Sequence, residues 1–143
     1  MPVAGKQGVL HITQGILTDR NNIQIIFIES FLMNWIPLKS EDEIFEIIEK
    51  SQSRPQIIFK HSTRCSISSM AKSRLERSPY PENADFYFLD LIAHRNISNK
   101  VADEFSVSHE SPQILLIKNG ECVYDESHSA ISMNEVAEQL EIA

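Results

Sequence analysis

The chain has 143 residues, of which 42% are hydrophobic and 23% are charged, a composition typical of a globular protein with a sizeable core. Its formal net charge of -7 disfavours a nucleic-acid partner, and no apolar run reaches the roughly 18 residues needed to cross a bilayer. The two cysteines, Cys65 and Cys122, cannot form a disulfide framework or a four-ligand zinc site alone. We therefore expect a cytoplasmic protein with no nucleic-acid, membrane or metal partner.

Residues 1–32 differ in composition from the rest of the chain. Their charges sum to zero, they hold three of the four glycines, and they end in an apolar run over residues 23–32. Three interpretations stay open: a secretory signal, which Gln24 and Glu29 within the run argue against; an extra edge strand; or a start assigned upstream of a true start at Met33. We treat residues 1–32 as an N-terminal extension and residues 33–143 as the domain.

From Met33 the pattern alternates between strands and helices. Residues 34–38 are apolar but interrupted by Pro37, which is typical of a short edge strand. Ser40 and Glu43 have the spacing of a capping box. The helix that follows should bury one apolar stripe, made of Ile44, Phe45, Ile47 and Ile48.

The middle of the chain predicts two more strands and two more helices. The nearly continuous apolar run over residues 56–60 indicates a buried strand. A helix should start at Cys65 and end before Pro79, because the residue preceding a proline avoids helical angles; its apolar positions are Met70, Ala71 and Leu75. Residues 86–89 are strand-like, and a four-residue spacing then predicts a helix that buries Ile97, Val101 and Phe105.

The last third predicts a hairpin and a closing helix. Strands over residues 113–117 and 121–124 flank Asn119-Gly120, a dipeptide typical of two-residue hairpin turns. Ser132 and Glu135 form a second capping box before an amphipathic helix. The order β-α-β-α-β-α-β-β-α predicts an α/β fold whose mixed sheet ends in an antiparallel hairpin.

The chemistry of the sequence is concentrated at Cys65. This residue follows a buried strand and opens a helix, where unpaired N–H groups and the helix dipole favour an anion. Arg64 adds a cation beside it. A thiol in this setting should lose its proton more easily than a free cysteine. We therefore expect a reactive thiol rather than an inert core cysteine.

Ser68 stands three residues after Cys65, where dithiol oxidoreductases have their second cysteine. A hydroxyl can donate a hydrogen bond to a thiolate, but it cannot form a disulfide. The reaction must therefore stop at a mixed disulfide or be completed by an outside thiol.

Ser111-Pro112 precedes the first strand of the predicted hairpin. The order of elements resembles the thioredoxin-like fold, in which a cis-proline lies at this point, faces the active cysteine, and follows a backbone segment that pairs with an extended substrate. The resemblance implies a cis bond at Pro112, although such bonds are uncommon before proline in general.

The run HSTRCSISSM over residues 61–70 resembles the signature of the monothiol bacilliredoxins, small thioredoxin-like proteins of the bacillithiol system. The likeness covers the chain from about Met33 and extends to residues 88–91, 109–113, 118–120 and 122–124. It implies a thioredoxin-like α/β/α sandwich with a mixed central sheet. It also implies removal of bacillithiol, a low-molecular-weight thiol, from proteins that carry mixed disulfides. Members commonly start near the position of Met33.

We assign Cys65 as the catalytic residue and expect six residues to bind substrate: Thr63, Arg64, Ser66, Ser68, Ser111 and Pro112. No bound cofactor is expected; bacillithiol would be the exchangeable thiol. A redox-inactive thioredoxin-like module, which holds an extended partner segment beside Pro112 without chemistry, remains the alternative.

The other histidines and the second cysteine favour structural interpretations. We expect His61 to pack or hydrogen-bond rather than act as a base, while His109 is close enough in sequence to Pro112 to be considered for the site. The remaining histidines have no spacing typical of metal ligands. Cys122 is expected to be a small strand residue, and a role as a distant resolving thiol stays open.

Overall fold

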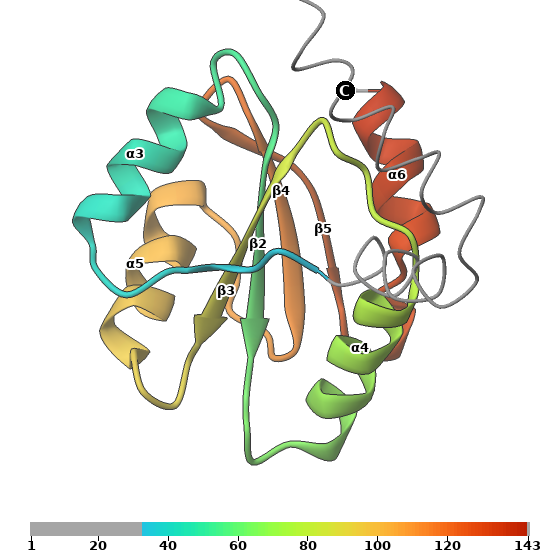
Figure 1. Ribbon diagram of the computed structural model, residues 1–143. Coiled ribbons are helices and arrows are strands. Elements are labelled where there is room, and N and C mark those ends of the chain that lie inside the picture. Colours follow the sequence, from blue (N-terminus) through green and yellow to red (C-terminus); the bar gives the residue numbers. More distant parts are fainter. Residues whose placement is uncertain (1–32, 143) are drawn as a thin grey trace, which may run out of the picture. The chain divides into compact units, whose positions relative to one another are not determined.

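Five strands form one mixed sheet and four α-helices cover its faces in residues 33–142, the part of the chain that the computed structural model describes (Figure 1). The interpretations of residues 1–32 concern a segment outside the described residues. The elements in chain order are β1 (Ile36–Pro37), α3 (Asp42–Lys50), β2 (Gln56–His61), α4 (Ser66–Arg77), β3 (Asp85–Asp90), α5 (Arg95–Phe105), β4 (Gln113–Lys118), β5 (Glu121–Ser127), the 3-10 turn η1 (His128–Ala130) and α6 (Met133–Ile142).

The strand order across the sheet is β1-β3-β2-β4-β5. The strands β1, β3 and β2 run parallel, whereas β4 is antiparallel to β2 and β5 is antiparallel to β4. The predicted mixed sheet with a terminal antiparallel hairpin is therefore confirmed. Because β2 is central, all six of its residues are buried, as its nearly continuous apolar sequence predicts.

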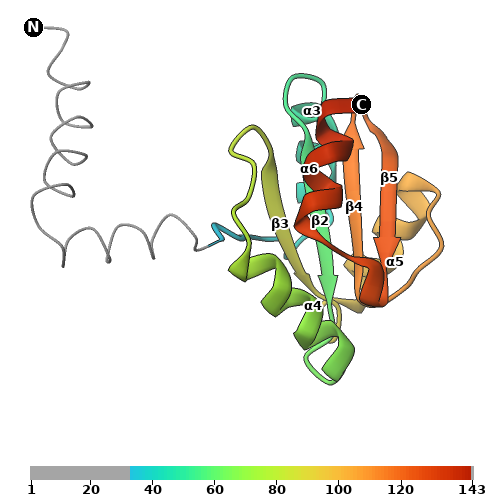
Figure 2. The ribbon, with the colours of Figure 1, turned by 90° about the vertical axis from the view of Figure 1, so that its right-hand side faces the viewer.

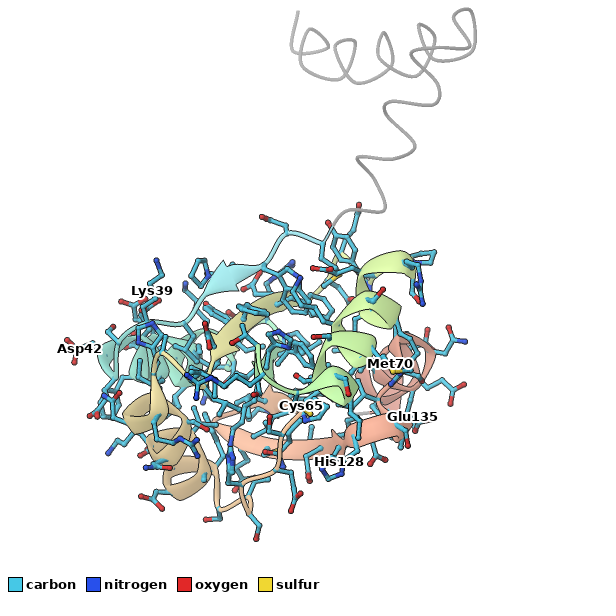
Figure 3. The ribbon with its side chains drawn as sticks, turned by 90° about the horizontal axis from the view of Figure 1, so that it is seen from below. Lys39, Asp42, Cys65, Met70, His128 and Glu135 are labelled. Atoms are coloured by element: carbon cyan, nitrogen blue, oxygen red, sulfur yellow. The ribbon has the colours of Figure 1, made fainter. Side chains whose placement is uncertain are left out.

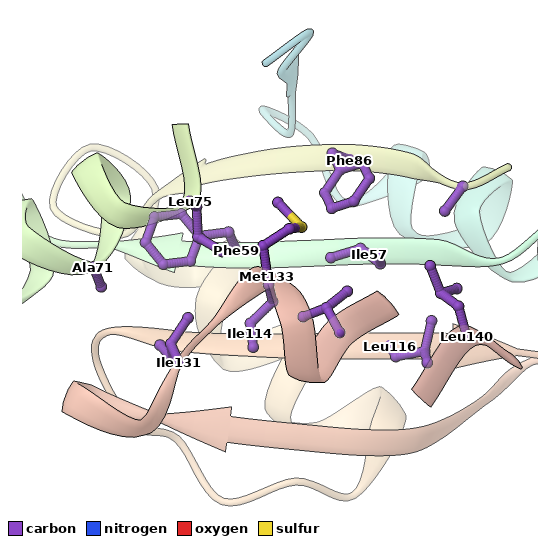
Figure 4. Packing of buried hydrophobic residues seen from close by; sticks show 12 residues of the cluster. Ile57, Phe59, Ala71, Leu75, Phe86, Ile114, Leu116, Ile131, Met133 and Leu140 are labelled. Carbon is purple, nitrogen blue, oxygen red and sulfur yellow. The ribbon is translucent and has the colours of Figure 1, made fainter. Parts of the chain in front are cut away.

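Alternate residues along the strands pack into two separate cores, one on each face of the sheet. Ile57 and Phe59 of β2 face α4 and α6, where they pack with residues of four other elements (Figure 4), and Ile58 faces α3 and α5. This alternation follows from the two-residue period of a strand. Figures 1 and 2 show the result: α3 and α5 cover one face of the sheet, and α4 and α6 cover the other. The predicted three-layer α/β/α architecture is confirmed.

Two apolar residues predicted for helix faces lie outside the cores. Phe45 of α3 is 52% exposed and Met70 of α4 is 62% exposed. The Lys100 Nζ lies 5.8 Å from the Phe45 ring centroid, so a cation covers part of that ring. The predicted first strand is also shorter than expected, covering only Ile36–Pro37, although the Leu38 N–H still donates to Phe88 O at 2.9 Å.

The hairpin turn is as predicted, and the two capping boxes differ from each other. Asn119 and Gly120 have φ values of 52° and 79°, the left-handed angles that a two-residue turn requires. Ser132 Oγ accepts the Glu135 N–H at 3.2 Å and so caps α6. At the other predicted box, the Ser40 hydroxyl instead donates to the Glu43 carboxylate at 3.1 Å.

None of the helices in the described part of the chain is both long and apolar enough to cross a membrane.

Candidate active site

Cys65 lies at the N-cap of α4, immediately after the turn that leaves β2 (Figure 3). Its backbone is extended, with φ -113° and ψ 120°. The Cys65 N–H donates to Ser62 O at 3.2 Å, and its carbonyl accepts the Ser69 N–H at 3.1 Å. The thiol is free and half-buried. The predicted placement of this cysteine, after a buried strand and at a helix start, is confirmed.

The surface around Cys65 is open and carries no negative charge on the helix start. Thr63, Arg64 and Ser66 are exposed, and the first turn of α4 has no acidic residue to oppose the positive end of the helix dipole. Ile67, 47% exposed, adds apolar surface. These three polar residues are therefore accessible from solvent, and their role in binding substrate stays a prediction.

Ser68 is completely buried and holds the turn beneath Cys65. Its Oγ accepts the Ser62 N–H at 3.0 Å and lies 2.7 Å from His61 Nδ1. A hydroxyl has one proton, and Ser68 donates it in a hydrogen bond to His61 Nδ1 when the neutral imidazole carries its own proton on Nε2. A hydrogen bond from Ser68 to the Cys65 thiolate would require this bond to be given up. Its predicted part in binding substrate remains a prediction.

His61 acts as a packing and hydrogen-bonding residue, as expected from the sequence. It is buried at the end of β2, with its ring centroid 5.4 Å from that of Phe88 and 6.0 Å from that of Phe59. Burial lowers the pKa of His61, and the nearby Lys72 cation lowers it further. The neutral imidazole is thus favoured, and in the tautomer protonated at Nε2 it can accept a hydrogen bond from Ser68 at Nδ1.

Ser111 and Pro112 lie at the same end of the sheet as Cys65. Lys60 of β2 pairs with Gln113 of β4, so one step further along the ladder Pro112 is opposite His61, which precedes the Cys65 turn. The Ser111-Pro112 peptide bond is cis, as predicted. The Pro112 carbonyl accepts the His128 N–H at 3.0 Å. The Ser111 Oγ is buried and has no hydrogen-bond partner among residues 33–142.

A buried lysine near this site was not singled out by the sequence analysis. Lys60 is 0% exposed, and burial lowers its pKa to about 8. Its Nζ lies 3.3 Å from His109 Nδ1, which is also 3.2 Å from Ser98 Oγ on α5. His109 Nδ1 therefore contacts both Lys60 and Ser98, and a place for His109 in the site stays a prediction. The only sequence signal for this contact was a single lysine, Lys60, within an apolar strand. If that strand had been at the edge of the sheet, the same lysine would have been exposed.

Cys122 has the environment of a structural thiol. It lies on β5, its Sγ donates to Tyr124 O at 3.3 Å, and it packs against the core that α3 and α5 cover. Burial raises the pKa of the Cys122 thiol to about 11. The thiol is therefore protonated near neutral pH and a weak nucleophile, in agreement with its interpretation as a small strand residue.

Comparison with known proteins gives one family and one fold. The model of the family described as monothiol bacilliredoxin BrxC matches residues 36–136. A solved structure described as a candidate oxidoreductase with a thioredoxin fold is 32% identical, covers 72% of this chain and 90% of its own, and has a TM-score of 0.64.

Two thioredoxins share only the fold at lower identity. The thioredoxin of Trypanosoma brucei brucei is 12% identical, with coverage of 76% of this chain and 89% of its own and a TM-score of 0.61. The thioredoxin of Malassezia sympodialis is 17% identical, with coverage of 75% and 90% and a TM-score of 0.58. The predicted thioredoxin-like fold is thereby confirmed.

The matched region includes the whole sheet as far as β5, the Cys65 turn and the loop that ends at Pro112. Family and fold together assign thiol–disulfide redox chemistry, with thiol-based redox partners, to this chain. Since the family model covers well over half of the sequence, the chain belongs to the monothiol bacilliredoxin family.

Proposed function

We propose that this protein removes bacillithiol, or a similar low-molecular-weight thiol, from protein mixed disulfides by monothiol exchange at Cys65. The Cys65 thiolate attacks the sulfur of the small thiol, the bond between that sulfur and the client sulfur breaks, and the client leaves as a thiolate. A second small thiolate then attacks the new disulfide on Cys65. It regenerates the Cys65 thiolate and leaves as a disulfide of two small thiols, so electrons and atoms balance over both steps.

The observation that carries this proposal is the setting of the Cys65 sulfur. It is half-buried at the start of α4, where the first N–H groups of a helix have no intrahelical acceptor and favour an anion. Position 68 offers a hydroxyl that is already bonded to Ser62 and His61. An internal resolving sulfur is therefore missing at the position one turn along, and an external thiol must complete the cycle.

The proposed cycle needs a compartment with a plentiful reduced thiol. The cytoplasm supplies one, whereas oxidising compartments would keep the mixed disulfides in place. We therefore propose a cytoplasmic site of action, with clients that carry an accessible cysteine in a mixed disulfide.

Intact-mass spectrometry of three proteins tests the proposal. Wild type, Cys65→Ser and Cys122→Ser are each mixed with a short peptide whose cysteine is joined to bacillithiol. We expect the wild type and Cys122→Ser to gain the mass of bacillithiol and to release the reduced peptide, and Cys65→Ser to do neither. Cys122→Ser is the matched control, because it removes the other thiol from a strand setting.

Two outcomes contradict the proposal in different ways. Equal loss of transfer in both variants points to a mechanism that needs two thiols. A wild type that binds the peptide but never gains the adduct is instead the redox-inactive binding module.

A further inference from the structure

Lys60 is an anomaly that the proposed exchange reaction does not use. It lies in the central strand with 0% of its surface exposed, yet no carboxylate among residues 33–142 lies within ion-pair distance of its amine. Isolated charges are rarely buried, because water solvates them better than a protein interior does. An apolar residue would fill the same space at lower cost, so the amine has a use that packing does not explain.

The Lys60 amine contacts a residue of the loop that leads to Pro112. The Lys60 Nζ lies 3.3 Å from His109 Nδ1, and the Ser98 hydroxyl of α5 lies 3.2 Å from the same nitrogen. Burial lowers the pKa of His109, and the charges of Lys60 and Arg95 lower it further. The neutral imidazole, with its own proton on Nε2, can therefore accept a hydrogen bond from the lysine amine at Nδ1.

A second buried polar side chain holds the same loop from the next strand. Gln113 of β4 is the direct cross-strand partner of Lys60, so both side chains project from the same face of the sheet. Its Nε2 donates to Ser108 O at 3.0 Å, and its Oε1 accepts the Glu110 N–H at 3.4 Å. Lys60 and Gln113 thus hold three consecutive residues, 108 to 110, from beneath.

We propose that Lys60 is a positioning residue that, through His109, fixes the loop of residues 108–112 in the form that receives an extended client segment beside Cys65. The inference deepens the proposed function and rests on it for the identity of the client. Lys60 itself touches no substrate. Its amine and the Gln113 amide order the backbone of the segment that ends at Pro112, and this segment lies opposite the end of β2 from which the Cys65 turn departs.

The test compares two substrates that differ in their need for the loop. A small symmetrical disulfide, such as 2-hydroxyethyl disulfide, reaches Cys65 without pairing with backbone. An eight-residue peptide with bacillithiol on its central cysteine is long enough to pair with the loop. We expect Lys60→Met to raise KM for the peptide at least tenfold. The kcat for the peptide and the rate with the small disulfide should each change less than twofold.

Three further variants test whether Lys60 acts through its contact with His109. His109→Ala changes an exposed residue and should reproduce the rise in KM. The double variant Lys60→Met/His109→Ala should have the same KM for the peptide as either single variant, because both substitutions remove the same contact. The exposed Lys39→Met is the matched control for loss of one positive charge, and both rates should stay at the wild-type value.

The proposal is overturned if Lys60→Met leaves KM for the peptide unchanged or lowers the rate with both substrates equally. Amide hydrogen exchange at residues 108–111, expected to be at least tenfold faster in the variant, measures loop order without any exchange chemistry. If the wild type does not react with the peptide, the proposed function is refuted. The exchange rates of the loop amides would still test the role of Lys60. If Lys60→Met does not fold, His109→Ala gives the same two measurements.

Discussion

Replacing Lys60 with methionine should remove a pH dependence of stability that one buried amine imposes on the fold. Burial lowers the pKa of Lys60 from 10.5 to about 8, whereas the unfolded chain has the ordinary value. Between these two pH values the unfolded state binds more protons than the folded state. The free energy of unfolding due to this group therefore rises as the pH rises, and the full cost is present below pH 8.

The size of the effect follows from the two pKa values. The difference between 10.5 and about 8 corresponds to about 3 kcal/mol, at about 1.4 kcal/mol for each pKa unit. About 2 kcal/mol of it is recovered between pH 7 and pH 9.5. Substitution also removes the contact with His109, which lowers the gain in the free energy of unfolding by about 1 kcal/mol. We therefore expect Lys60→Met to be about 2 kcal/mol more stable than wild type at pH 7.

Urea unfolding at pH 7, 8, 9 and 9.5 measures this difference. Wild type, Lys60→Met and Lys39→Met are compared, so that the titration of all other groups cancels between pairs. The gap between wild type and Lys60→Met should close by about 2 kcal/mol over this range, while Lys39→Met follows wild type. A gap that stays constant with pH would show that the Lys60 amine is solvated in the folded protein, and the argument from its burial would fail.

Four further predictions concern Ser68, the second thiol and the hairpin turn. Ser68→Ala should lower the free energy of unfolding by about 1–3 kcal/mol in urea titrations, because the buried Ser62 N–H loses its acceptor; an unchanged value would mean that water replaces the hydroxyl. Ser68→Cys should release bacillithiol from Cys65 without an outside thiol and leave a disulfide two hydrogens lighter by mass spectrometry, whereas an adduct with the wild-type lifetime would show that residue 68 does not reach the sulfur. In Cys65→Ser, alkylation of Cys122 by iodoacetamide should be slow at pH 8 and rise about tenfold per pH unit up to about pH 11, because burial raises the pKa of its thiol to about 11; a plateau below pH 9 would contradict this value. Gly120→Ala should cost about 1 kcal/mol in thermal or urea unfolding, since an L-residue at φ 79° is strained even though its Cβ would meet only ordinary contacts; no loss of stability would mean that the turn changes shape.

Local signals in the sequence were sufficient for most of the fold. Asn119-Gly120 needs only its own backbone preferences to predict the turn, and a buried strand followed by a helix start locates Cys65. Pro79 ends α4 by local sterics: the helix stops at Arg77, and Ser78 has extended angles. Each of these features depends on residues within a few positions of one another, so the chain alone determines them.

Features that depend on contacts between distant segments could not be predicted in the same way. The contact of Lys60 with His109 joins residues 49 positions apart, and nothing in the strand itself tells whether its lysine meets solvent or a loop. Ser68 was correctly placed one turn after Cys65, but its bond to His61 depends on how the strand end and helix meet. Phe45 lies outside the core because the buried stripe of α3 is narrower than the apolar run in its sequence. The width of that stripe depends on how the helix packs against the sheet.

The hairpin turn between β4 and β5 is bonded to the end of α3 by a single serine. Ser51, which follows α3, accepts the Asn119 N–H with its carbonyl at 2.9 Å and the Gly120 N–H with its hydroxyl at 2.8 Å. Turn amides at a surface usually exchange with solvent within the time of local fluctuations. Here both are bonded to a residue 68 and 69 positions away, so they exchange only when the end of α3 at Ser51 separates from the hairpin. The tip of the hairpin thus belongs to the same cooperative folding unit as the first helix of the domain, although the two are far apart in sequence.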